Sequence, residues 1–416
     1  MRHSSVESGC LVPHFARTVA IAVLVTFFGV CAVRAEPKYG PGASDKEIKL
    51  GQTAPYSGPA SLFSVSAKVG LAYFKMLNET QGGINGRKIN LISLDDAYSP
   101  PKTVEQTRKL VEDDEVLAIV GMIGTLANVA VAKYLNSKKV PQILGTTGAD
   151  KLNDPKAYPW TTTFLSSQDV EGRMYARYIL DQMPKARIGV LYQNDDYGKG
   201  YYNPFRSEFG ERADQMIVKA EPYETSSPTV DSSIVSLKAA GADLVYLAVT
   251  PKFAAQAIRK IYELAWHPTV ITLTATASIS SVFQPAGVEA SKGVLTALWR
   301  KDIDDPKWRD DADVAEYRAF MKQWAPELPP NDGTQGYQTA VIIAEVLKRC
   351  GDNLTRENLM MEATNIKGLR LPLYITGITI DVSPEDRTPW RSARMAKFDG
   401  TGWQFVTDLM TIPPRP

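Results

Sequence analysis

Four threonines follow apolar runs that have the length and composition of buried strands. Thr125 comes after VLAIVGMIG, Thr146 and Thr147 lie in LGTTGADKL, and Thr250 follows ADLVYLAV. Hydroxyl groups together with neighbouring backbone N–H groups can bind a carboxylate without a positively charged side chain. The TTG turn also precedes residues that predict a helix, and a helix N-terminus favours anions. The pattern indicates a small-anion site, and a plain strand-to-helix connection with capping threonines is the alternative.

Two aromatic residues occur in loops that we expect at the same edge of the fold. Phe63 follows the SGPAS segment, and Tyr197 lies in NDDYGKG. Small-molecule sites combine apolar walls with few polar anchors, so these rings could enclose the apolar body of a ligand. For each ring taken singly, an ordinary core or rim position is the alternative.

The residue types that most enzymes need are scarce. The chain has no CxxC, HExxH or GxSxG, and GKG at 198–200 lacks the rest of a phosphate-binding loop. His267 is the one histidine beyond residue 35, and its WHP setting indicates a surface turn. The aspartate pairs at 95–96 and 195–196 could do acid–base work, but turn formation or helix capping is the commoner use. We therefore expect no metal site, no cofactor and no enzymatic activity.

The first 35 residues have the composition of a secretory signal peptide. Arg17 precedes the apolar run TVAIAVLVTFFGVCAV, which ends in VRA. A positive start, an apolar run of this length and small residues before the cleavage point predict a secretory signal peptide that is cleaved after Ala35. A membrane anchor needs a longer run, and a lipid-modified Cys31 would need a small residue where Val30 stands.

The composition of the chain is that of a globular protein. It has 416 residues, 44% of them hydrophobic, and a net charge of +1 with histidine neutral. The length predicts two domains or one large one, and the scattered basic residues argue against nucleic-acid binding. Without the leader, Cys350 is the one remaining cysteine, so we expect no internal disulfide and a large core instead.

The order of elements predicts two α/β units in series. Apolar strands of Val, Ile and Leu alternate with helices of 10–15 residues, first up to about residue 150 and again from VEGRMYARYILDQM to VITLTATAS. This rhythm is typical of parallel sheets covered by helices on both faces. Beyond about 297 the sequence becomes helix-rich, and FDGTGW near the end predicts a hairpin. Ligands of open parallel sheets lie outside the carboxyl ends of the strands, where the threonines stand.

Five segments, in this order and spacing, resemble the type I periplasmic binding proteins of ABC importers, in the leucine/isoleucine/valine-binding branch. They are IKLGQTAPYSGPAS, GGINGRKINLISLDDAYSP, VGMIGTLANVAVAKYLNSKKVPQILGTTGADKL, NDDYGKG and GYQTAVIIAEVLK. The resemblance implies two Rossmann-like lobes with central parallel sheets, joined by a three-strand hinge. It places the hinge crossovers near 163–168, 293–298 and 371–378. The lobes it implies are 46–165 plus 298–370 for lobe one, and 168–293 plus 378–416 for lobe two.

The same resemblance implies where a ligand carboxylate is bound. It assigns this group to the Thr125 hydroxyl and to the turn at Thr146 and Thr147, with backbone and hydroxyl contacts from Thr146. The family pattern has a serine or threonine where this chain has Gly148, so one hydroxyl is missing.

The walls and the amine site follow in the same way. Phe63 matches the aromatic wall of lobe one, Tyr197 the tyrosine of lobe two, and Thr250 a rim position. The acidic residue that holds an amine in the family corresponds to Ala275 here, with Asp96 or Asp196 as conceivable substitutes. Burying an ammonium without a carboxylate partner is costly, so this departure favours an organic acid over a branched-chain amino acid.

The resemblance thus implies a monomeric periplasmic substrate-binding component that delivers a small carboxylate or amino-acid-like solute to an inner-membrane ABC permease. A binder of short amides or urea on the same fold is one alternative. A ligand-sensing regulator is another, and the leader argues against it.

Overall fold

The computed structural model describes residues 36–415. The predicted signal peptide, residues 1–35, lies outside this range. From Pro37 onward the chain forms one compact unit. Within the described range, no helix combines the length and the apolar character that a membrane span requires.

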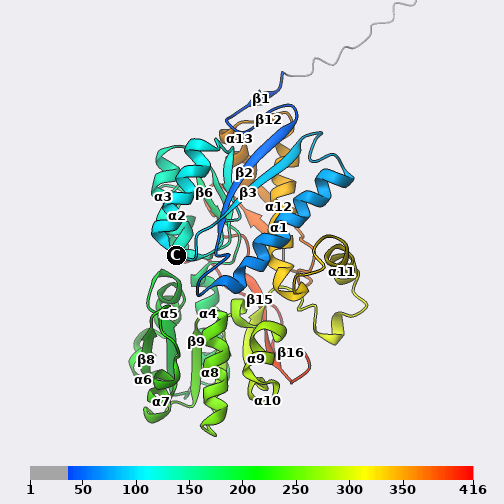
Figure 1. Ribbon diagram of the computed structural model, residues 1–416. Helices are drawn as coiled ribbons and strands as arrows, with labels where there is room; N and C mark the ends of the chain where they lie inside the picture. The colour runs from blue at the N-terminus through cyan, green and yellow to red at the C-terminus, as the bar shows by residue number, and fades with distance from the viewer. Residues whose placement is uncertain (1–35, 416) are drawn as a thin grey trace, which may run out of the picture. The chain divides into compact units, whose positions relative to one another are not determined.

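Lobe one is built on a five-stranded parallel sheet in the order β3-β2-β4-β5-β6. Its strands are β2 (Glu47–Ala54), β3 (Lys88–Asp95), β4 (Ala118–Val120), β5 (Gln142–Gly145) and β6 (Thr161–Thr163). Helices α2 (Pro100–Arg108) and α3 (Thr125–Ser137) pack together on one face. On the other face, α1 (Ser64–Thr80) packs against α12 (Pro330–Cys350), a pairing visible in Figure 1. A helix distant in sequence therefore completes lobe one.

Lobe two is built on a larger mixed sheet. Its order is β16-β15-β11-β10-β9-β7-β8, with β17 (Met410–Thr411) pairing with β15. The parallel strands are β7 (Ile188–Gln193), β8 (Ile217–Tyr223), β9 (Leu244–Ala248), β10 (Thr269–Thr272) and β11 (Leu295–Leu298), and the antiparallel ones are β15 (Ser392–Phe398) and β16 (Trp403–Phe405). Its longer helices are α4 (Gln168–Gln182), α5 (Asp196–Glu208), α7 (Asp231–Ala239) and α8 (Pro251–Glu263). The predicted α/β class with two parallel-sheet lobes is confirmed.

Local sequence explains several of these elements. All five residues of β9, LVYLA, are buried, as expected for a strand covered on both faces. Ser167 caps α4 by accepting the Val170 N–H, and Asp195 caps α5 by accepting the N–H groups of Tyr197 and Gly198. The hairpin predicted at FDGTGW is the β15–β16 pair, and Cys350 is buried and free.

The remaining helices and strands complete the fold. These are β1 (Lys38–Tyr39), paired with β12 (Asn353–Leu354), then α6 (Ala213–Met216), α9 (Gln284–Ala286), α10 (Val288–Ser291), α11 (Ala312–Trp324), α13 (Arg356–Ala363), and β13 (Ile366–Leu369), paired with β14 (Ile380–Val382). The helix expected after the TTG turn is only a 3-10 turn, Asp150–Asn153. The strand expected through TLTATAS ends at Thr272 and is followed by a 3-10 turn, Thr274–Thr276.

The C-terminal boundary of lobe two differs from the expected one. Strand β14 pairs with β13, and Arg387 donates to the carbonyl oxygens of Tyr158 and Thr161 in lobe one. Residues 380–391 thus lie with lobe one, and the second sheet resumes only at Ser392. We therefore propose the predicted two-lobe division with this boundary moved from 378 to 391.

Candidate functional site

A cavity lies where the carboxyl ends of strands from both sheets meet. About 490 Å³ of space free of protein atoms lies among its lining residues, including space open to solvent. We call it the threonine cavity, and its lining comprises Phe63, Ser66, Tyr98, Ile123, Gly124, Thr125, Thr146, Thr147, Gly148, Leu165, Tyr197, Tyr201, Ala275 and Gln335. Seven of the eight residues singled out in the sequence are in this set.

Two threonine hydroxyls form the polar end of the threonine cavity. The Oγ1 atoms of Thr125 and Thr147 lie 2.8 Å apart in a hydrogen bond, and Gln168 Nε2 donates to Thr125 Oγ1 at 3.3 Å. Both threonines are buried, with 2% of their surface exposed. Thr125 is the first residue of α3, after Gly124 in a left-handed conformation at φ 101°. The hydroxyls therefore stand beside the N-terminus of a 13-residue helix, whose dipole favours negative charge.

The backbone of the TTG turn contributes less than expected. The Thr146 N–H donates to Met122 O and the Thr147 N–H to Gly145 O, each at 2.8 Å. These two N–H groups hold the turn against β4 and β5, so the expected backbone contacts from Thr146 are a wrong prediction. The Thr147 hydroxyl also accepts the Ala149 N–H at 3.1 Å. The N–H groups of Thr146 and Thr147 are therefore already paired within the protein.

Gly148 lies at a close crossing of two backbone segments. A Cβ atom at this position would come within 2.1 Å of the Ser166 carbonyl oxygen, and the Gly148 oxygen accepts the Gln168 N–H at 2.7 Å. No side chain larger than hydrogen fits without moving the backbone. The hydroxyl missing from the family pattern is therefore excluded by the way the chain enters α4.

Aromatic rings form the walls of the threonine cavity. Phe63 and Tyr197 line it as expected, and Tyr98 and Tyr201 are additional. The sequence signal for Tyr98 was its place just after the aspartate pair at the end of β3. Asp96 is buried and accepts the Thr53 hydroxyl at 2.8 Å and the Tyr98 N–H at 2.9 Å. The aspartate pair therefore forms a turn that presents the Tyr98 ring.

The turn that carries Tyr98 is strained. Ala97 and Tyr98 have φ values of 50° and 59°, a region that costs non-glycine residues about 1–3 kcal/mol each. Burial raises the pKa of the Tyr98 phenol, and the Asp195 carboxylate of lobe two adds to this effect. The ring therefore extends from lobe one to the edge of lobe two. Gly124 is next to it, because a Cβ there would lie 2.6 Å from the ring.

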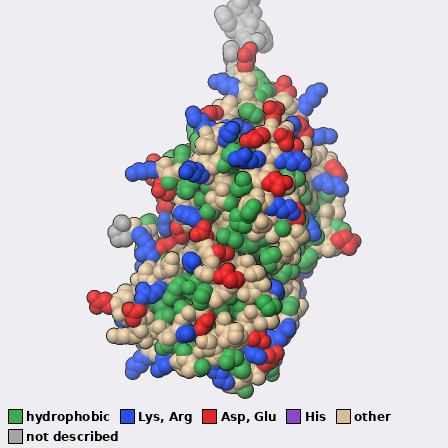
Figure 2. All heavy atoms as spheres, turned by 60° about the vertical axis from the view of Figure 1, so that its left-hand side comes forward, with side chains coloured by type: hydrophobic (Ala, Val, Ile, Leu, Met, Phe, Trp, Pro, Cys, Tyr) green, Lys and Arg blue, Asp and Glu red, His purple; other side chains and the backbone are tan. Residues whose placement is uncertain are grey.

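Two polar contacts join the lobes beside the site. Lys151 Nζ lies 2.8 Å from Asp196 Oδ2, and the Ser278 hydroxyl donates to Asp332 Oδ1 at 3.0 Å. The structure thus has the lobes in contact around the cavity. On the face shown in Figure 2, basic and acidic side chains are intermixed.

Thr250 is the predicted residue that the structure places elsewhere. It is buried, its N–H donates to the Tyr223 hydroxyl at 3.2 Å, and its own hydroxyl lies 3.4 Å from the same oxygen. It is not in the lining of the threonine cavity. The expected rim role fails because Thr250 packs inward as the residue preceding α8, where its backbone and side chain meet Tyr223.

The segment at Ala275 brings no carboxylate into the threonine cavity. Ala275 lines it, and the neighbouring Thr274 is held by Glu171, whose Oε1 accepts the Thr274 N–H at 2.8 Å and the Tyr175 hydroxyl at 2.7 Å. Burial raises the pKa of Glu171. Asp196 is engaged with Lys151. The residues lining the threonine cavity include no acidic or basic side chain.

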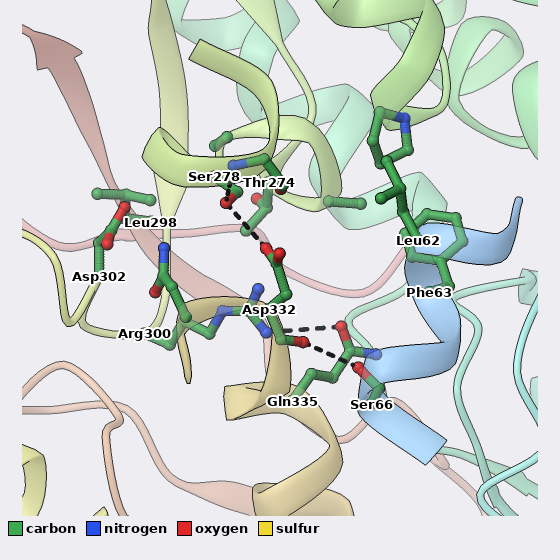
Figure 3. Close-up of a pocket in the computed structure, with 15 residues that line it drawn as sticks. Leu62, Phe63, Ser66, Thr274, Ser278, Leu298, Arg300, Asp302, Asp332 and Gln335 are labelled. Carbon is green, nitrogen blue, oxygen red and sulfur yellow. Dashed lines mark hydrogen bonds between the residues drawn. The ribbon is translucent and has the colours of Figure 1, made fainter. Parts of the chain in front are cut away.

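A second cavity adjoins the first and is shown in Figure 3. The two share Phe63, Ser66, Ala275 and Gln335. We call it the arginine cavity, and its further lining comprises Leu62, Pro251, Thr274, Ala277, Ser278, Ser281, Leu298, Arg300, Asp302, Asn331 and Asp332. Sequence reasoning missed its charged residues because they lie between 300 and 332, in a stretch that was expected only to cover lobe one.

Comparisons with known proteins agree with this architecture. A family model described as periplasmic binding protein matches residues 47–402. Leu/Ile/Val-binding protein homolog 3 of Brucella melitensis biotype 1 is 27% identical over 208 residues, an alignment that covers 49% of this chain and 55% of that relative. The chain thus spans about half the length of this relative.

Two solved structures share the fold at low identity. A branched-chain amino acid ABC transporter protein from Thermus thermophilus, solved with bound valine, has a TM-score of 0.79 and 18% identity, covering 89% of this chain and 98% of that one. A fatty acid ABC transporter substrate-binding protein from Thermomonospora curvata has a TM-score of 0.76 and 20% identity, covering 90% and 95%. With two parallel-sheet lobes meeting at a cavity and a family match over residues 47–402, this chain belongs to the type I periplasmic binding proteins, a family of solute-binding proteins.

Proposed function

We propose that this protein is the periplasmic substrate-binding component of an ABC importer and that it captures a small organic carboxylate between its lobes. The observation that carries the proposal is the hydrogen-bonded pair of Thr125 and Thr147 hydroxyls in the threonine cavity. A hydroxyl can rotate to donate to a carboxylate oxygen, and the N-terminus of α3 adds favourable potential. The proposed ligand-binding residues are Phe63, Thr125, Thr146, Thr147, Gly148, Tyr197 and Ala275.

The cavity chemistry favours an acid without an α-amino group. An ammonium needs a carboxylate partner when it is removed from water. Ala275 supplies none, and the Glu171 carboxylate beyond it already receives hydrogen bonds from Thr274 and Tyr175. Asp332, whose Oδ1 accepts from Ser278, lines the adjoining cavity, where it acts on the Arg300 charge. The relative named for leucine, isoleucine and valine and the fold neighbour solved with valine keep amino acids in the test set.

The proposed role in transport goes one step beyond membership of the solute-binding family. Capture by closure of two lobes works because the ligand binds the closed state more tightly than the open one. The family implies a periplasmic location, and the predicted leader at 1–35 supports it over a ligand-sensing regulator. We propose a monomer that docks on an inner-membrane permease driven by cytoplasmic ATPases.

A ligand screen by thermal unfolding tests the proposal. The protein is expressed with its own leader, purified, and heated at pH 7 with branched-chain amino acids, their keto acids, aromatic carboxylates, short amides and urea. A ligand at a hundredfold excess over its Kd stabilises the folded state by about 2.7 kcal/mol. We expect stabilisation by acids without an amine. Stabilisation by leucine or valine alone would refute the ligand class, and product formation from any bound compound would refute a purely binding role.

A further inference from the structure

The arginine cavity contains a guanidinium group without an ion-pair partner. Arg300 follows β11, and its Nη1 donates to Gln335 Oε1 at 3.5 Å. Its guanidinium carbon lies 5.0 Å from the centre of the Trp299 ring. Within residues 36–415 it forms no ion pair. Burial lowers the pKa of Arg300, and the Asp302 and Asp332 carboxylates offset this effect only in part.

Two carboxylates face the same cavity. Asp332 Oδ1 accepts the Ser278 hydroxyl at 3.0 Å, a bond drawn in Figure 3, and its second oxygen has no hydrogen-bond donor within the described range. Asp302 is buried, and its two oxygens accept the Asp304 N–H at 3.0 Å and Trp403 Nε1 at 3.1 Å. Asp332 therefore retains a free acceptor, whereas both oxygens of Asp302 are in use.

The mixture of charges restricts what can bind there. A negatively charged group would meet Arg300 but also two carboxylates, and a positively charged group would meet the carboxylates but also Arg300. An uncharged group that accepts from Arg300 and donates to Asp332 satisfies both residues at once. Hydrogen bonds to charged partners are stronger than those between neutral groups, so such a group would be well discriminated.

We propose that the arginine cavity binds an uncharged carboxamide or ureido group at the far end of a ligand whose carboxylate lies against Thr125 and Thr147. The substrate class is then a linear monocarboxylic acid with a terminal amide or urea. The two cavities adjoin at Phe63, Ala275 and Gln335, so one extended molecule can occupy both. This inference rests on the proposed carboxylate-binding function and extends it.

Isothermal titration with a matched set of acids tests the proposal. The set comprises glutaramate, glutarate, the corresponding ω-amino acid and the isopropyl-ended isostere of glutaramate, each also one methylene shorter and longer. We expect the amide of the best length to bind at least tenfold more tightly than its isostere, a difference of about 1.4 kcal/mol. It should also bind more tightly than both charged analogues.

Two variants locate the effect. Arg300→Met should bring the amide to the affinity of the isostere while leaving the isostere unchanged. Asp332→Asn should weaken the amide in the same direction, and it keeps the test available if Arg300→Met does not fold. Arg309→Met makes the same charge change at an exposed position outside both cavities and should change nothing.

The outcomes separate the two levels of the proposal. If the isostere binds as well as the amide at every length, or a charged analogue binds more tightly, the arginine-cavity inference is wrong and carboxylate binding stands. If no carboxylate in this set or in the thermal screen binds, the proposed function itself is overturned and the inference with it.

Discussion

Replacing Gly148 by serine would restore the hydroxyl that the family pattern has at this position, and we expect it to damage the site instead of completing it. The new Cβ atom would lie 2.1 Å from the Ser166 carbonyl oxygen, whereas real Cβ atoms essentially never come within 3.0 Å of another heavy atom. The backbone segments must therefore separate by about 0.9 Å. Ser166 and Gln168 are both buried with 2% exposure, so there is little free space for the shift.

The expected loss of folding stability in Gly148→Ser has two parts. Forcing extra atoms into a packed interior costs about 1–3 kcal/mol. Lengthening the 2.7 Å bond from the Gln168 N–H to the Gly148 oxygen costs about 1 kcal/mol more. The total is about 2–4 kcal/mol. With an unfolding entropy of about 2.1 cal/mol/K per residue over roughly 380 residues, the melting temperature should fall by about 3–5 °C.

Urea unfolding monitored by circular dichroism, with titration of the best ligand, measures both effects. Gly70→Ala is the matched control, because it lies in α1 and its Cβ would meet only the Gly336 oxygen at 3.9 Å. Alanine is about 1 kcal/mol better than glycine inside a helix, so this variant should be as stable as the wild type or slightly more stable. A Gly148→Ser protein as stable as the wild type, with unchanged affinity, would refute the close-crossing argument.

Three further predictions concern the hydroxyl pair, the contact between lobes and a buried carboxyl. Thr147→Val removes the hydroxyl that is hydrogen-bonded to Thr125 and should weaken carboxylate binding about tenfold, as measured by titration. Thr147→Ser keeps a hydroxyl and should bind the carboxylate as the wild type does. An equal loss of affinity in both variants would indicate a packing effect. Lys151→Ala breaks the half-exposed pair with Asp196 and should lower affinity by no more than about fivefold, an effect that added salt should erase; a larger, salt-independent loss would contradict a surface pair. Burial raises the pKa of Asp302 to about 6, so the folded state favours the protonated form of this carboxyl. This preference contributes fully to folding stability below about pH 4, and the contribution is lost as the pH rises through 6. Between pH 4.5 and 7, the free energy of unfolding measured in urea should fall by about 2 kcal/mol more for the wild type than for Asp302→Asn. If the two proteins show the same dependence of unfolding free energy on pH, this carboxyl titrates normally and the prediction is wrong.

Much of the fold follows from local patterns in the sequence. The continuous apolar runs and intervening helices indicate parallel sheets, because a strand buried on both faces needs apolar side chains on both. The hairpin at FDGTGW and the caps at Ser167 and Asp195 depend on residues close in sequence. The length of the element after the TTG turn and the boundary at Ser392 were not predictable, since they depend on contacts such as those from Arg387 to lobe one.

The candidate site, like the fold, was predictable from the sequence only in part. The sequence alone determined that threonines and aromatic rings stand at the carboxyl ends of strands, and the rule for ligands in parallel sheets brings five of the six predicted ones to one cavity. Tertiary structure alone decided which hydroxyls pair, why position 148 must be glycine, and that Thr250 packs inward. It also decided that Arg300 and Asp332 share a cavity with Ser66. Such relations depend on side-chain direction and on crossings between segments tens to hundreds of residues apart, and no local pattern of residue types encodes those distances.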